Sequence, residues 1–487
     1  MIPMKQFWPA LLLLCLPLFA QKQVIDLPQP NLATLERTDR QSSGNRFAAP
    51  IPLDLRPSEE VGQWTQHDGV NGRWELSFRL PGTYGLALFL DDVNLPSGGV
   101  VFLENLNVAT FESKEQNWLN SRKIFTDFLP GDEVTLVYQG PVFQHSDQPF
   151  HIFRADHVYR PEIYQPRRSL RDFGNSNECQ VNANCPDGDD WEDEKSGTAR
   201  IILVVEEGTG YCSGNLINNT AEDGKPLFLT GFHCQDGFTP IYDLWRFDFG
   251  YRSIGCENPT SEPAFTAYTG AIYRAGRQEN DFLLLELADP AFDGENHYFA
   301  GWDRSEGIVT GEVHGFHHPR GDIQKMGRST GMSILSGSID WNNGVTTPPS
   351  HHFQMVYNLG TYQVGSSGSA VFDQNHRIRG QLNGGNFFCP GTTTAFIGRL
   401  ALSWTGGETA RTRLSDWLDP INTGVTTLDG ATMAASTGGR ILRGTTNWQG
   451  NPVQGVRFVF NWGPSVDTVF TDEFGEYSVQ RPGNATG

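Results

Sequence analysis

The sequence predicts an all-β protein built from several turn-rich domains. Its 487 residues include 54 glycines and 29 prolines, and 12% are aromatic, a composition that favours short strands joined by tight turns. Apolar or alternating runs recur between these turns, and between Cys179 and Leu418 only Arg413–Leu418 has a helical pattern. We therefore expect a β-sandwich, then a pair of β-barrels, then the first strands of another sandwich.

The formal net charge of −20 bears on the partners of the chain. The charge is spread along the sequence without a long acidic block. Nucleic-acid-binding proteins present a basic face, so we expect no nucleic-acid partner. The composition fits a soluble secreted protein, which we expect to be a monomer without a cofactor or a bound metal.

Residues 1–20 have the pattern of a secretory signal peptide. Lys5 precedes an apolar run from Ala10 to Ala20, and Phe19-Ala20 stands before Gln21. A transmembrane helix, the alternative, would need about 20 apolar residues. No later stretch is long and apolar enough to span a bilayer, so we expect secretion and no membrane span.

Residues 21–172 read as a β-sandwich followed by a linker. The predicted strands lie at 74–80, 84–90, 99–103, 133–138 and 150–153. No cluster of catalytic residue types occurs among them. The segment 159–168 is rich in Pro and Arg, so Arg167, Arg168 and Arg171 are candidate processing sites. We expect a prosegment that inhibits the following domain; a retained accessory domain is the alternative.

Residues 173–428 contain more closely spaced strand patterns than residues 21–172, and the sequence pattern changes again at about Gly438. The predicted strands of the middle part lie at 200–205, 213–217, 226–230, 282–287, 369–372 and 378–382, which fit two β-barrels. At 438–487, Thr471-Asp-Glu-Phe-Gly-Glu-Tyr477 resembles the carboxypeptidase-regulatory-like β-sandwich family. Because few strands of that family are present, we expect a partial sandwich.

Three stretches supply the residue types of a Ser-His-Asp triad. His233, Asp281 and Ser367 each stand at the end of an apolar strand-like run, in the chain order His, Asp, Ser. Serine is a poor nucleophile unless a base lies within hydrogen-bond reach and a carboxylate orients that base. The N–H groups of Gly365 and Ser367 would form an oxyanion hole. Ser366 is the competing nucleophile, and Gly-Ser-Ser-Gly alone would also suit a linker.

Six cysteines remain when Cys15, inside the predicted signal peptide, is set aside. An even number in a secreted chain predicts three disulfides, and the sequence alone allows fifteen pairings of Cys179, Cys185, Cys212, Cys234, Cys256 and Cys389. No C-x-x-C pair indicates a zinc site. We interpret His314, His317 and His318 as structural, and the acidic residues at 187–194 as a solvated loop rather than a calcium site.

The triad stretches resemble those of trypsin-like serine proteases. Further motifs are similar to the bacterial lysyl endopeptidases, among them Cys212-Ser-Gly-Asn-Leu-Ile, Gly301-Trp-Asp-Arg304, His317-His-Pro319, Gly380-Gln-Leu-Asn-Gly-Gly385 and Ser403-Trp-Thr-Gly-Gly407. The resemblance implies a double β-barrel, a secreted proenzyme and endopeptidase action on proteins or peptides. It makes His233 the base, Asp281 its orienting group and Ser367 the nucleophile. It also implies the disulfides Cys179–Cys389, Cys185–Cys256 and Cys212–Cys234.

The chain departs from that family where a lysine side chain would be recognised. The family's pocket carboxylate aligns with Ala395, the trypsin-type carboxylate aligns with Thr361, and the family's pocket histidine aligns with Asn383. A buried ammonium group without a carboxylate is very unfavourable. We therefore expect small or apolar P1 side chains rather than Lys or Arg, in a pocket formed by Thr361, Asn383, Gly384, Gly385, Ala395 and Trp341.

Ser366 also predicts how the proenzyme is activated. Chymotrypsin-type zymogens use an Asp before the nucleophile to pair with a new N-terminus, and Ser366 cannot form that ion pair. Cleavage near Arg171 would then act by removing an occluding prosegment. The alternative to an enzyme is an inactive protease fold that serves as a secreted binding or adhesion protein.

Overall fold

The computed structural model describes residues 22–39, 45–58, 60–105, 111–113, 123–143, 147–163, 173–289, 291–292, 294, 297–341, 343–432, 441–449, 451–461, 466–471 and 475–480. The predicted signal peptide and the candidate processing sites Arg167, Arg168 and Arg171 lie outside the described residues. Contacts divide the chain into two units, Met1–Leu35 with Phe47–Arg171 and Glu36–Arg46 with Asp172–Gly487. None of the described helices is long and apolar enough to cross a membrane.

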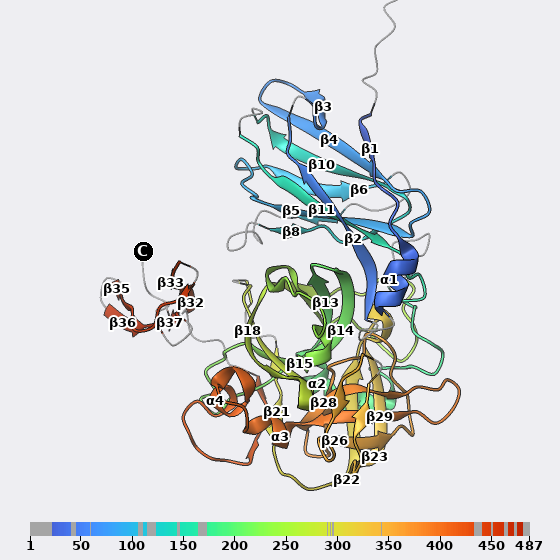
Figure 1. The fold of residues 1–487 in the computed structure, drawn as a ribbon, viewed down its shortest axis with the longest axis vertical. Helices are drawn as coiled ribbons and strands as arrows, with labels where there is room; N and C mark the ends of the chain where they lie inside the picture. The colour runs from blue at the N-terminus through green and yellow to red at the C-terminus, as the bar shows by residue number, and fades with distance from the viewer. Residues whose placement is uncertain are drawn as a thin grey trace, which may run out of the picture. The chain divides into compact units, whose positions relative to one another are not determined.

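The first unit contains two antiparallel-rich sheets (Figure 1). One sheet has the order β1-β4-β10-β6-β7, with β3 on β4; its strands are β1 (Val24–Asp26), β3 (Gln63–His67), β4 (Asn71–Arg79), β6 (Val100–Glu104), β7 (Phe111–Ser113) and β10 (Glu133–Pro141). In the other sheet β11 pairs with β2 and β5, and β5 pairs with β8 and β9. Its strands are β2 (Arg46–Leu55), β5 (Gly85–Asp91), β8 (Ile124–Phe125), β9 (Leu129–Pro130) and β11 (His151–Val158).

Alternation along the strands explains the packing of this unit. Trp74, Leu76 and Phe78 point to one face of β4 and are buried in one cluster with Leu88 and Leu90 of β5. This cluster joins the inner faces of both sheets. The predicted β-sandwich is therefore present, and all five predicted strands coincide with β4, β5, β6, β10 and β11.

The second unit begins with a sheet that curls into the first barrel (Figure 1). The strand order is β18-β19-β15-β14-β13-β16-β17, and the strands are β13 (Thr198–Val205), β14 (Gly208–Leu216), β15 (Leu227–Gly231), β16 (Arg246–Phe249), β17 (Thr266–Thr269), β18 (Ala271–Arg277) and β19 (Phe282–Leu287). β13, β15 and β19 are buried along their whole length, as expected for their continuous apolar runs.

The second barrel is closed. β22 pairs with β23, and the ring continues through β26, β29, β28 and β27 back to β22. Its strands are β22 (Val309–His317), β23 (Lys325–Ile334), β26 (His352–Val356), β27 (Ala370–Phe372), β28 (Arg377–Asn386) and β29 (Thr394–Arg399). Short strands complete the unit: β12 (Val181–Asn182), β20 (Tyr298–Phe299), β21 (Gly301–Asp303), β24 (Ile339–Asp340), β25 (Thr346–Thr347), β30 (Thr427–Leu428) and β31 (Ala431–Thr432).

One hydrophobic cluster joins the two barrels. Leu229 and Leu284 of the first barrel share it with Phe316 and Phe372 of the second, and all four are fully buried. Each buried side chain removes apolar surface from water and so favours association of the barrels. The shared core places the ends of β15 and β19 beside the loop before β27. The predicted pair of β-barrels is therefore confirmed.

Helices are few and short. They are α1 (Leu32–Asp39), α2 (Glu192–Gly197), α3 (Leu400–Trp404) and α4 (Ser415–Leu418), with 3-10 turns η2 (Pro186–Trp191), η3 (Phe232–Cys234), η4 (Tyr242–Leu244), η5 (Gln278–Asn280), η7 (Pro319–Gly321) and η8 (Ala410–Thr412). α4 confirms the predicted helical stretch. The pattern did not predict α2 and α3, because helices of five or six residues are too short for a 3.6-residue apolar period to show.

The C-terminal stretch forms paired strands. β32 (Ile441–Thr445) pairs with β37 (Glu476–Gln480), β33 (Asn447–Trp448) with β34 (Asn451–Pro452), and β35 (Arg457–Asn461) with β36 (Val466–Phe470). Phe458 stacks on Tyr477, with ring centroids 4.1 Å apart. The described residues form three two-stranded sheets, and the partial sandwich expected at 438–487 stays a prediction.

Candidate active site

His233 stands on a turn fixed by a strand and a disulfide. The buried strand β15 ends at Gly231, and the 3-10 turn η3 follows at once. The disulfide Cys212–Cys234 ties this turn to β14. The Phe232 N–H donates to the Asp281 carbonyl at 2.9 Å, so the turn is also held to the start of β19. The imidazole is thereby kept in a defined place with 13% of its side chain exposed.

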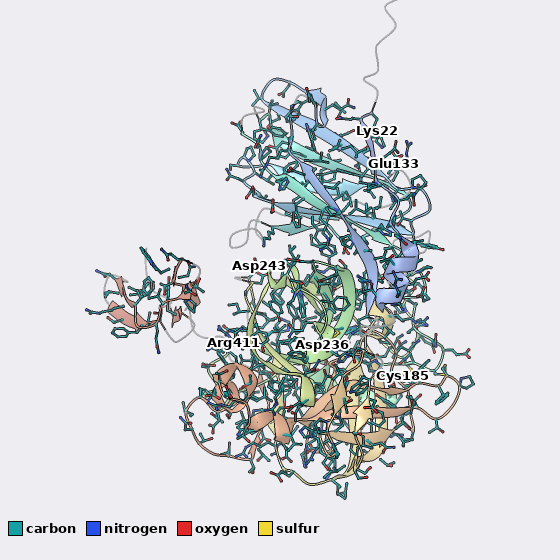
Figure 2. All side chains as sticks on the ribbon, in the orientation of Figure 1. Lys22, Glu133, Cys185, Asp236, Asp243 and Arg411 are labelled. Atoms are coloured by element: carbon teal, nitrogen blue, oxygen red, sulfur yellow. A yellow bond between two sulfur atoms is a disulfide. The ribbon has the colours of Figure 1, made fainter. Side chains whose placement is uncertain are left out.

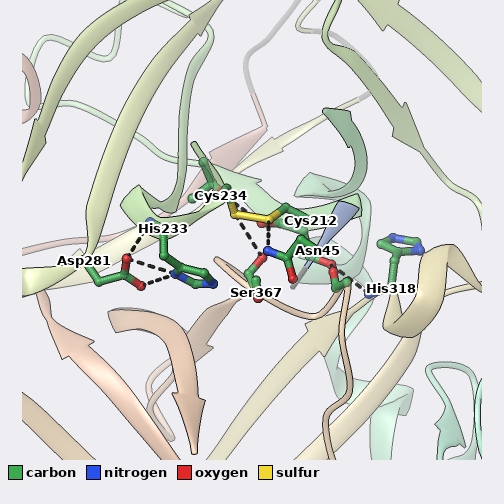
Figure 3. Close-up of a disulfide and its surroundings, with 10 residues drawn as sticks. Asn45, Cys212, His233, Cys234, Asp281, His318 and Ser367 are labelled. Carbon is green, nitrogen blue, oxygen red and sulfur yellow. Dashed lines mark hydrogen bonds and ion pairs between the residues drawn. A yellow bond between two sulfur atoms is a disulfide. The ribbon is translucent and has the colours of Figure 1, made fainter. Parts of the chain in front are cut away.

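Asp281 is positioned by the pairing of β15 with β19. It follows η5 in a left-handed conformation, with φ of 55°, which Asp tolerates better than most residues. Its carboxylate accepts the His233 N–H at 2.8 Å and lies 2.8 and 3.0 Å from His233 Nδ1 (Figure 3). Burial raises the pKa of Asp281, and its contacts with His233 oppose that rise. The carboxylate fixes the ring so that Nε2 is left for other partners.

Ser367 lies on a glycine turn between the two barrels. Gly365 and Gly368 flank it with φ of 93° and 81°, a region closed to most side chains. A Cβ at Gly368 would lie 2.1 Å from Thr230 Oγ1 and 2.5 Å from the Gly231 nitrogen. Only glycine therefore allows this turn to approach the end of β15, where η3 carries His233.

The turn leaves two backbone donors available. The Arg320 N–H donates to the Val364 carbonyl at 2.6 Å, and in a trans peptide the Gly365 N–H then points the opposite way. The Ser213 hydroxyl donates to the Gly365 carbonyl at 2.8 Å, and the Ser213 N–H donates to the Ser367 carbonyl at 2.8 Å. Within the described part of the chain, neither the Gly365 N–H nor the Ser367 N–H has an acceptor. Two such donors are what an oxyanion hole requires.

A second histidine, His317, holds Ser366, the residue before Ser367. His317 Nδ1 lies 2.8 Å from Ser366 Oγ, which also accepts the Gln363 N–H at 3.1 Å. Burial, helped by His318 and Lys325, lowers the pKa of His317 to about 3, so this imidazole is neutral. Nδ1 can therefore accept the Ser366 hydroxyl hydrogen, which points Ser366 into the second barrel and away from His233.

His233, Asp281 and Ser367 border a cavity of 230 Å³ at the junction of the barrels. The residues that line it come from both barrels and from the N-terminal segment: Asn45, His233, Asp236, Gln278, Asp281, Trp341, Asn343, Val345, Tyr362, Gln363, Val364, Ser367, Leu382, Asn383, Gly384 and Gly385. His233 and Ser367 share this lining, yet no hydrogen bond joins Ser367 Oγ and His233 Nε2 in this structure. Such bonds often form only when substrate closes the site.

The predicted pocket residues divide into two groups. The first group lines the cavity and comprises Asn383, Gly384, Gly385 and Trp341. The Trp341 ring packs so closely against Gly384 that a Cβ added there would lie 2.9 Å from it. Thr361 and Ala395, 2% and 0% exposed, are not among the lining residues. Sequence reasoning missed Asn45, Asp236, Gln278, Asn343 and Tyr362, because polar residues in loops give no periodic signal.

Asn383 has a histidine partner that the sequence did not indicate. Its Nδ2 lies 3.0 Å from His352 Nε2. Burial, then the nearby His351 and His233, lowers the pKa of His352 to about 3, so the ring is neutral and Nε2 accepts the amide hydrogen. The position aligned with the family's pocket histidine thus holds an amide whose orientation is fixed by a neutral imidazole.

Asn45 reaches the site from the N-terminal part of the chain. Its carbonyl accepts the Tyr211 N–H at 3.2 Å, and its Nδ2 lies 3.3 Å from Cys212 Sγ (Figure 3). The side chain lines the cavity and only 2% of the residue is exposed. Asn45 therefore occupies the side of the cavity formed by the Cys212–Cys234 disulfide.

The three disulfides are Cys179–Cys389, Cys185–Cys256 and Cys212–Cys234. The family resemblance implied this pairing, which is one of the fifteen that the sequence alone allows. Each bridge adds about 2–4 kcal/mol to stability by restricting the unfolded chain.

One group of described residues has the geometry of a metal site. The donor atoms of Asp91, Asp92 and His151 lie within 4.8 Å of one another in the first unit. Arg56 pairs with Asp92 at 2.6 Å, and His151 Nδ1 lies 2.8 Å from Asp91. Because these carboxylates already have partners, we assign no metal to them.

Three of the six acidic residues at 187–194 form ion pairs. Asp187 pairs with Arg328 at 3.0 Å, Glu192 pairs with Arg252 at 3.0 Å, and Glu194 lies 3.1 Å from His376. Trp191 within the same stretch is buried against His314, with ring centroids 4.4 Å apart. Asp187, Asp189, Asp190, Glu192 and Asp193 are exposed, as expected for a solvated acidic stretch, whereas Glu194 and Trp191 are buried.

Comparison with known proteins supports the predicted resemblance. Residues 173–396 match the family model of the lysyl endopeptidase C-terminal domain. The lysyl endopeptidase of Pseudomonas aeruginosa is 25% identical over 320 residues, which cover 62% of this chain and 65% of that protein. The chain thus spans slightly less than two thirds of the length of this relative. The resemblance to lysyl endopeptidases is confirmed for the double-barrel part.

Solved structures of proteases are also similar to this chain. The active form of the Rv3671c protease from M. tuberculosis has a TM-score of 0.30 and 14% identity, covering 42% of this chain and 77% of that chain. Deg5 has a TM-score of 0.29 and 12% identity, covering 44% and 87%. The serine endoprotease from Yersinia pestis has a TM-score of 0.29 and 12% identity, covering 43% and 61%.

Proposed function

We propose that this chain, whose residues 173–396 match the lysyl endopeptidase C-terminal domain, is a secreted serine endopeptidase made as a proenzyme. The observation that carries the proposal is the His233–Asp281 pair at a cavity that Ser367 also lines, where the N–H groups of Gly365 and Ser367 have no acceptor among the described residues. Three disulfides support secretion, because such bonds persist in oxidising compartments.

In the proposed mechanism, Ser367 Oγ attacks the carbonyl carbon of the scissile bond. His233 Nε2 takes the hydroxyl proton, and Asp281 stabilises the resulting imidazolium through Nδ1. The N–H groups of Gly365 and Ser367 bind the developing oxyanion. His233 then gives the proton to the leaving amine. In the second half of the reaction water attacks the acyl-enzyme, His233 takes a proton from this water, and the proton passes to Ser367 Oγ as the acyl group leaves.

The experiment that tests this function is labelling of the processed protein with a fluorophosphonate probe, followed by mapping of the label. We expect the label on the Ser367 hydroxyl, together with hydrolysis of peptides. A processed and folded protein that neither takes the label nor cleaves peptides would instead support the alternative, a protease fold used for binding or adhesion.

For the P1 residue we propose small or apolar side chains. The cavity wall next to Ser367 contains Val364, Leu382, Gly384 and Gly385, and the positions of the expected carboxylates hold Thr361 and Ala395. The Tyr362 hydroxyl is buried and has no partner among the described residues, and burial raises its pKa, so it stays neutral. Fast cleavage after Lys or Arg in a peptide library would contradict this assignment.

We further propose that the N-terminal part inhibits the enzyme through Asn45 and Arg46. Asn45 fills part of the cavity. Arg46 anchors it, because the guanidinium contacts Asp39 Oδ1 at 2.8 Å and donates to the Glu207 carbonyl at 2.7 Å. A substrate chain needs the space of Asn45, so the segment must leave before hydrolysis begins.

Arg46→Ala in the unprocessed chain is expected to raise the rate of fluorophosphonate labelling about tenfold, since a hydrogen bond to a charged group contributes about 1.5 kcal/mol. Processing is prevented by replacing Arg167, Arg168 and Arg171 with Gln. Arg56→Ala removes a guanidinium that pairs, among the described residues, with Asp92 of the first unit, and serves as the control. Equal labelling rates in both variants would contradict inhibition through this anchor.

Ser366→Ala tests how the oxyanion hole is held. Loss of the Ser366–His317 hydrogen bond frees the loop that carries Gly365, so kcat is expected to fall about tenfold with KM nearly unchanged. His317→Asn is expected to have a similar effect. If both act through one bond, the double variant loses little more than either single variant. A fall confined to KM would contradict this role.

A further inference from the structure

The cavity beside the triad is negatively charged. Its lining contains the carboxylates of Asp236 and Asp281 and, among the described lining residues, no Lys or Arg. Asp281 uses both oxygens on His233. Asp236 (labelled in Figure 2) is therefore the lining carboxylate that remains available to a ligand.

The partners of Asp236 are neutral amides. Gln278 Nε2 donates to Asp236 Oδ2 at 2.6 Å, and Asn343 Nδ2 lies 3.4 Å from the same oxygen. No ion pair with a basic group involves Asp236 in the part of the chain that the structure describes. The two amides orient the carboxylate and leave its charge uncompensated, a state that favours a cationic ligand.

The backbone around Asp236 holds it next to the catalytic base. Its N–H donates to the Phe232 carbonyl at 3.1 Å, and the disulfide at Cys234 fixes the same turn. Gln278 begins the 3-10 turn η5, which Asp281 follows directly. The carboxylate is thus tied to both turns that carry the His–Asp pair, so its place relative to His233 is set by the fold.

The β24–β25 turn and the end of β28 indicate which substrate residue faces Asp236. Asn343 belongs to the turn between β24 and β25, and Trp341 of that turn packs against Gly384 at the exposed end of β28. A substrate that extends along Gly384 and Gly385, with its scissile carbonyl at Ser367, presents successive side chains to opposite faces. When the P1 side chain points to the part of the cavity formed by Val364 and Leu382, the P2 side chain faces the part formed by His233 and Asp236.

We propose that Asp236 forms a subsite for a basic P2 residue, so that the enzyme prefers Lys or Arg immediately before a small or apolar P1 residue. The inference rests on the proposed endopeptidase function and names part of its substrate. Because the carboxylate is half-buried and accessible from the cavity, an ammonium or guanidinium group can pair with it and keep most of its hydration.

The test compares two peptides that differ only at P2, one with Lys and one with norleucine, which keeps the alkyl chain and lacks the ammonium group. The processed wild-type enzyme is expected to show about fivefold higher kcat/KM for the Lys peptide, the size of a favourable exposed ion pair. This ratio should shrink in 0.5 M salt, at a Debye length of about 4 Å. In Asp236→Asn the ratio is expected to fall to about one.

Glu279→Gln is the matched control. Glu279 is exposed, neighbours Gln278, carries the same charge and does not line the cavity, so this variant should keep the wild-type ratio. A Lys-to-norleucine ratio that stays the same in Asp236→Asn overturns the proposal. Equal loss of the ratio in Glu279→Gln also overturns it, since a general field of negative charge would then be the cause.

A second comparison uses only the wild-type enzyme and so does not depend on folding of a variant. A peptide with Glu at P2 is expected to be cleaved about fivefold more slowly than one with Gln, because like charges repel. Equal rates for these two peptides would overturn the proposal. Absence of both hydrolysis and fluorophosphonate labelling would instead refute the proposed function, so the two failures are distinguishable.

Discussion

Ser367→Ala is expected to lower kcat/KM by about 10⁵-fold or more and to abolish fluorophosphonate labelling, because removal of the nucleophile in a triad has effects of this size. Ser367 is the serine whose own N–H and that of Gly365 lack acceptors among the described residues, and it shares the cavity with His233. Ser366 cannot replace it, since its hydroxyl is engaged by His317 in the second barrel.

The measurement is kcat/KM on a peptide that the wild-type enzyme cleaves, together with labelling of an active-site probe. Ser336→Ala changes an exposed serine outside the cavity and is expected to retain both activities. Far-ultraviolet circular dichroism should show that Ser367→Ala is folded. Labelling that persists in folded Ser367→Ala would assign the nucleophile to another residue and contradict the mechanism.

Asp248→Asn is expected to destabilise the folded protein by about 3–5 kcal/mol, because it leaves buried cations without their counter-charge. Asp248 Oδ2 lies 2.9 and 2.7 Å from Nε and Nη2 of Arg200, and Oδ1 lies 2.9 Å from Arg246 Nε. Both Arg200 and Asp248 are 0% exposed, and Arg200 also donates to the Gly321 carbonyl at 2.8 Å. The network thus connects the first barrel to the turn that precedes β23.

The loss of unfolding free energy in Asp248→Asn is expected to depend on pH in one direction. Burial alone would raise the pKa of Asp248, but Arg246 and Arg200 outweigh it and hold the pKa below the usual Asp value. A carboxyl whose folded pKa is lowered stabilises the protein above its unfolded pKa of about 3.9, and this contribution is lost as the pH falls through the folded pKa. The difference in unfolding free energy between the wild-type protein and Asp248→Asn should therefore be greatest at pH 7 and shrink below pH 4 or so.

Denaturant unfolding of the processed protein at pH 7 and at pH 3.5 or so measures this difference. Asp416→Asn is the control, because Asp416 forms a partly exposed ion pair with Arg413, and such pairs contribute less than about 1 kcal/mol. Equal unfolding free energies of the two variants at pH 7 would show that the Arg200–Asp248–Arg246 network does not stabilise the fold.

The strands next to His233, Asp281 and Ser367 could be predicted from the sequence, and so could the turn that contains Ser367. Continuous apolar runs before His233 and after Asp281 gave β15 and β19, and the glycines around Ser367 gave a turn before β27. These signals are local: apolar period, turn residues and chain order depend on neighbours within a few positions. The even number of cysteines likewise predicted three disulfides, although only the family resemblance implied their pairing.

The composition of the cavity could be decided only by the tertiary structure. Asn45, Asp236 and Asn343 come from three loops far apart in the chain, and nothing in their local sequence distinguishes them from other surface polar residues. The bond between His317 and Ser366 joins the end of β22 to the turn before β27, in a barrel whose closure depends on the pairing of β27 with β22. Chain order and residue type thus predicted the candidate triad and the proposed chemistry, because a triad needs particular side chains on particular turns. The charge and shape presented to a substrate depend on loops brought together by long-range packing, which no local pattern records.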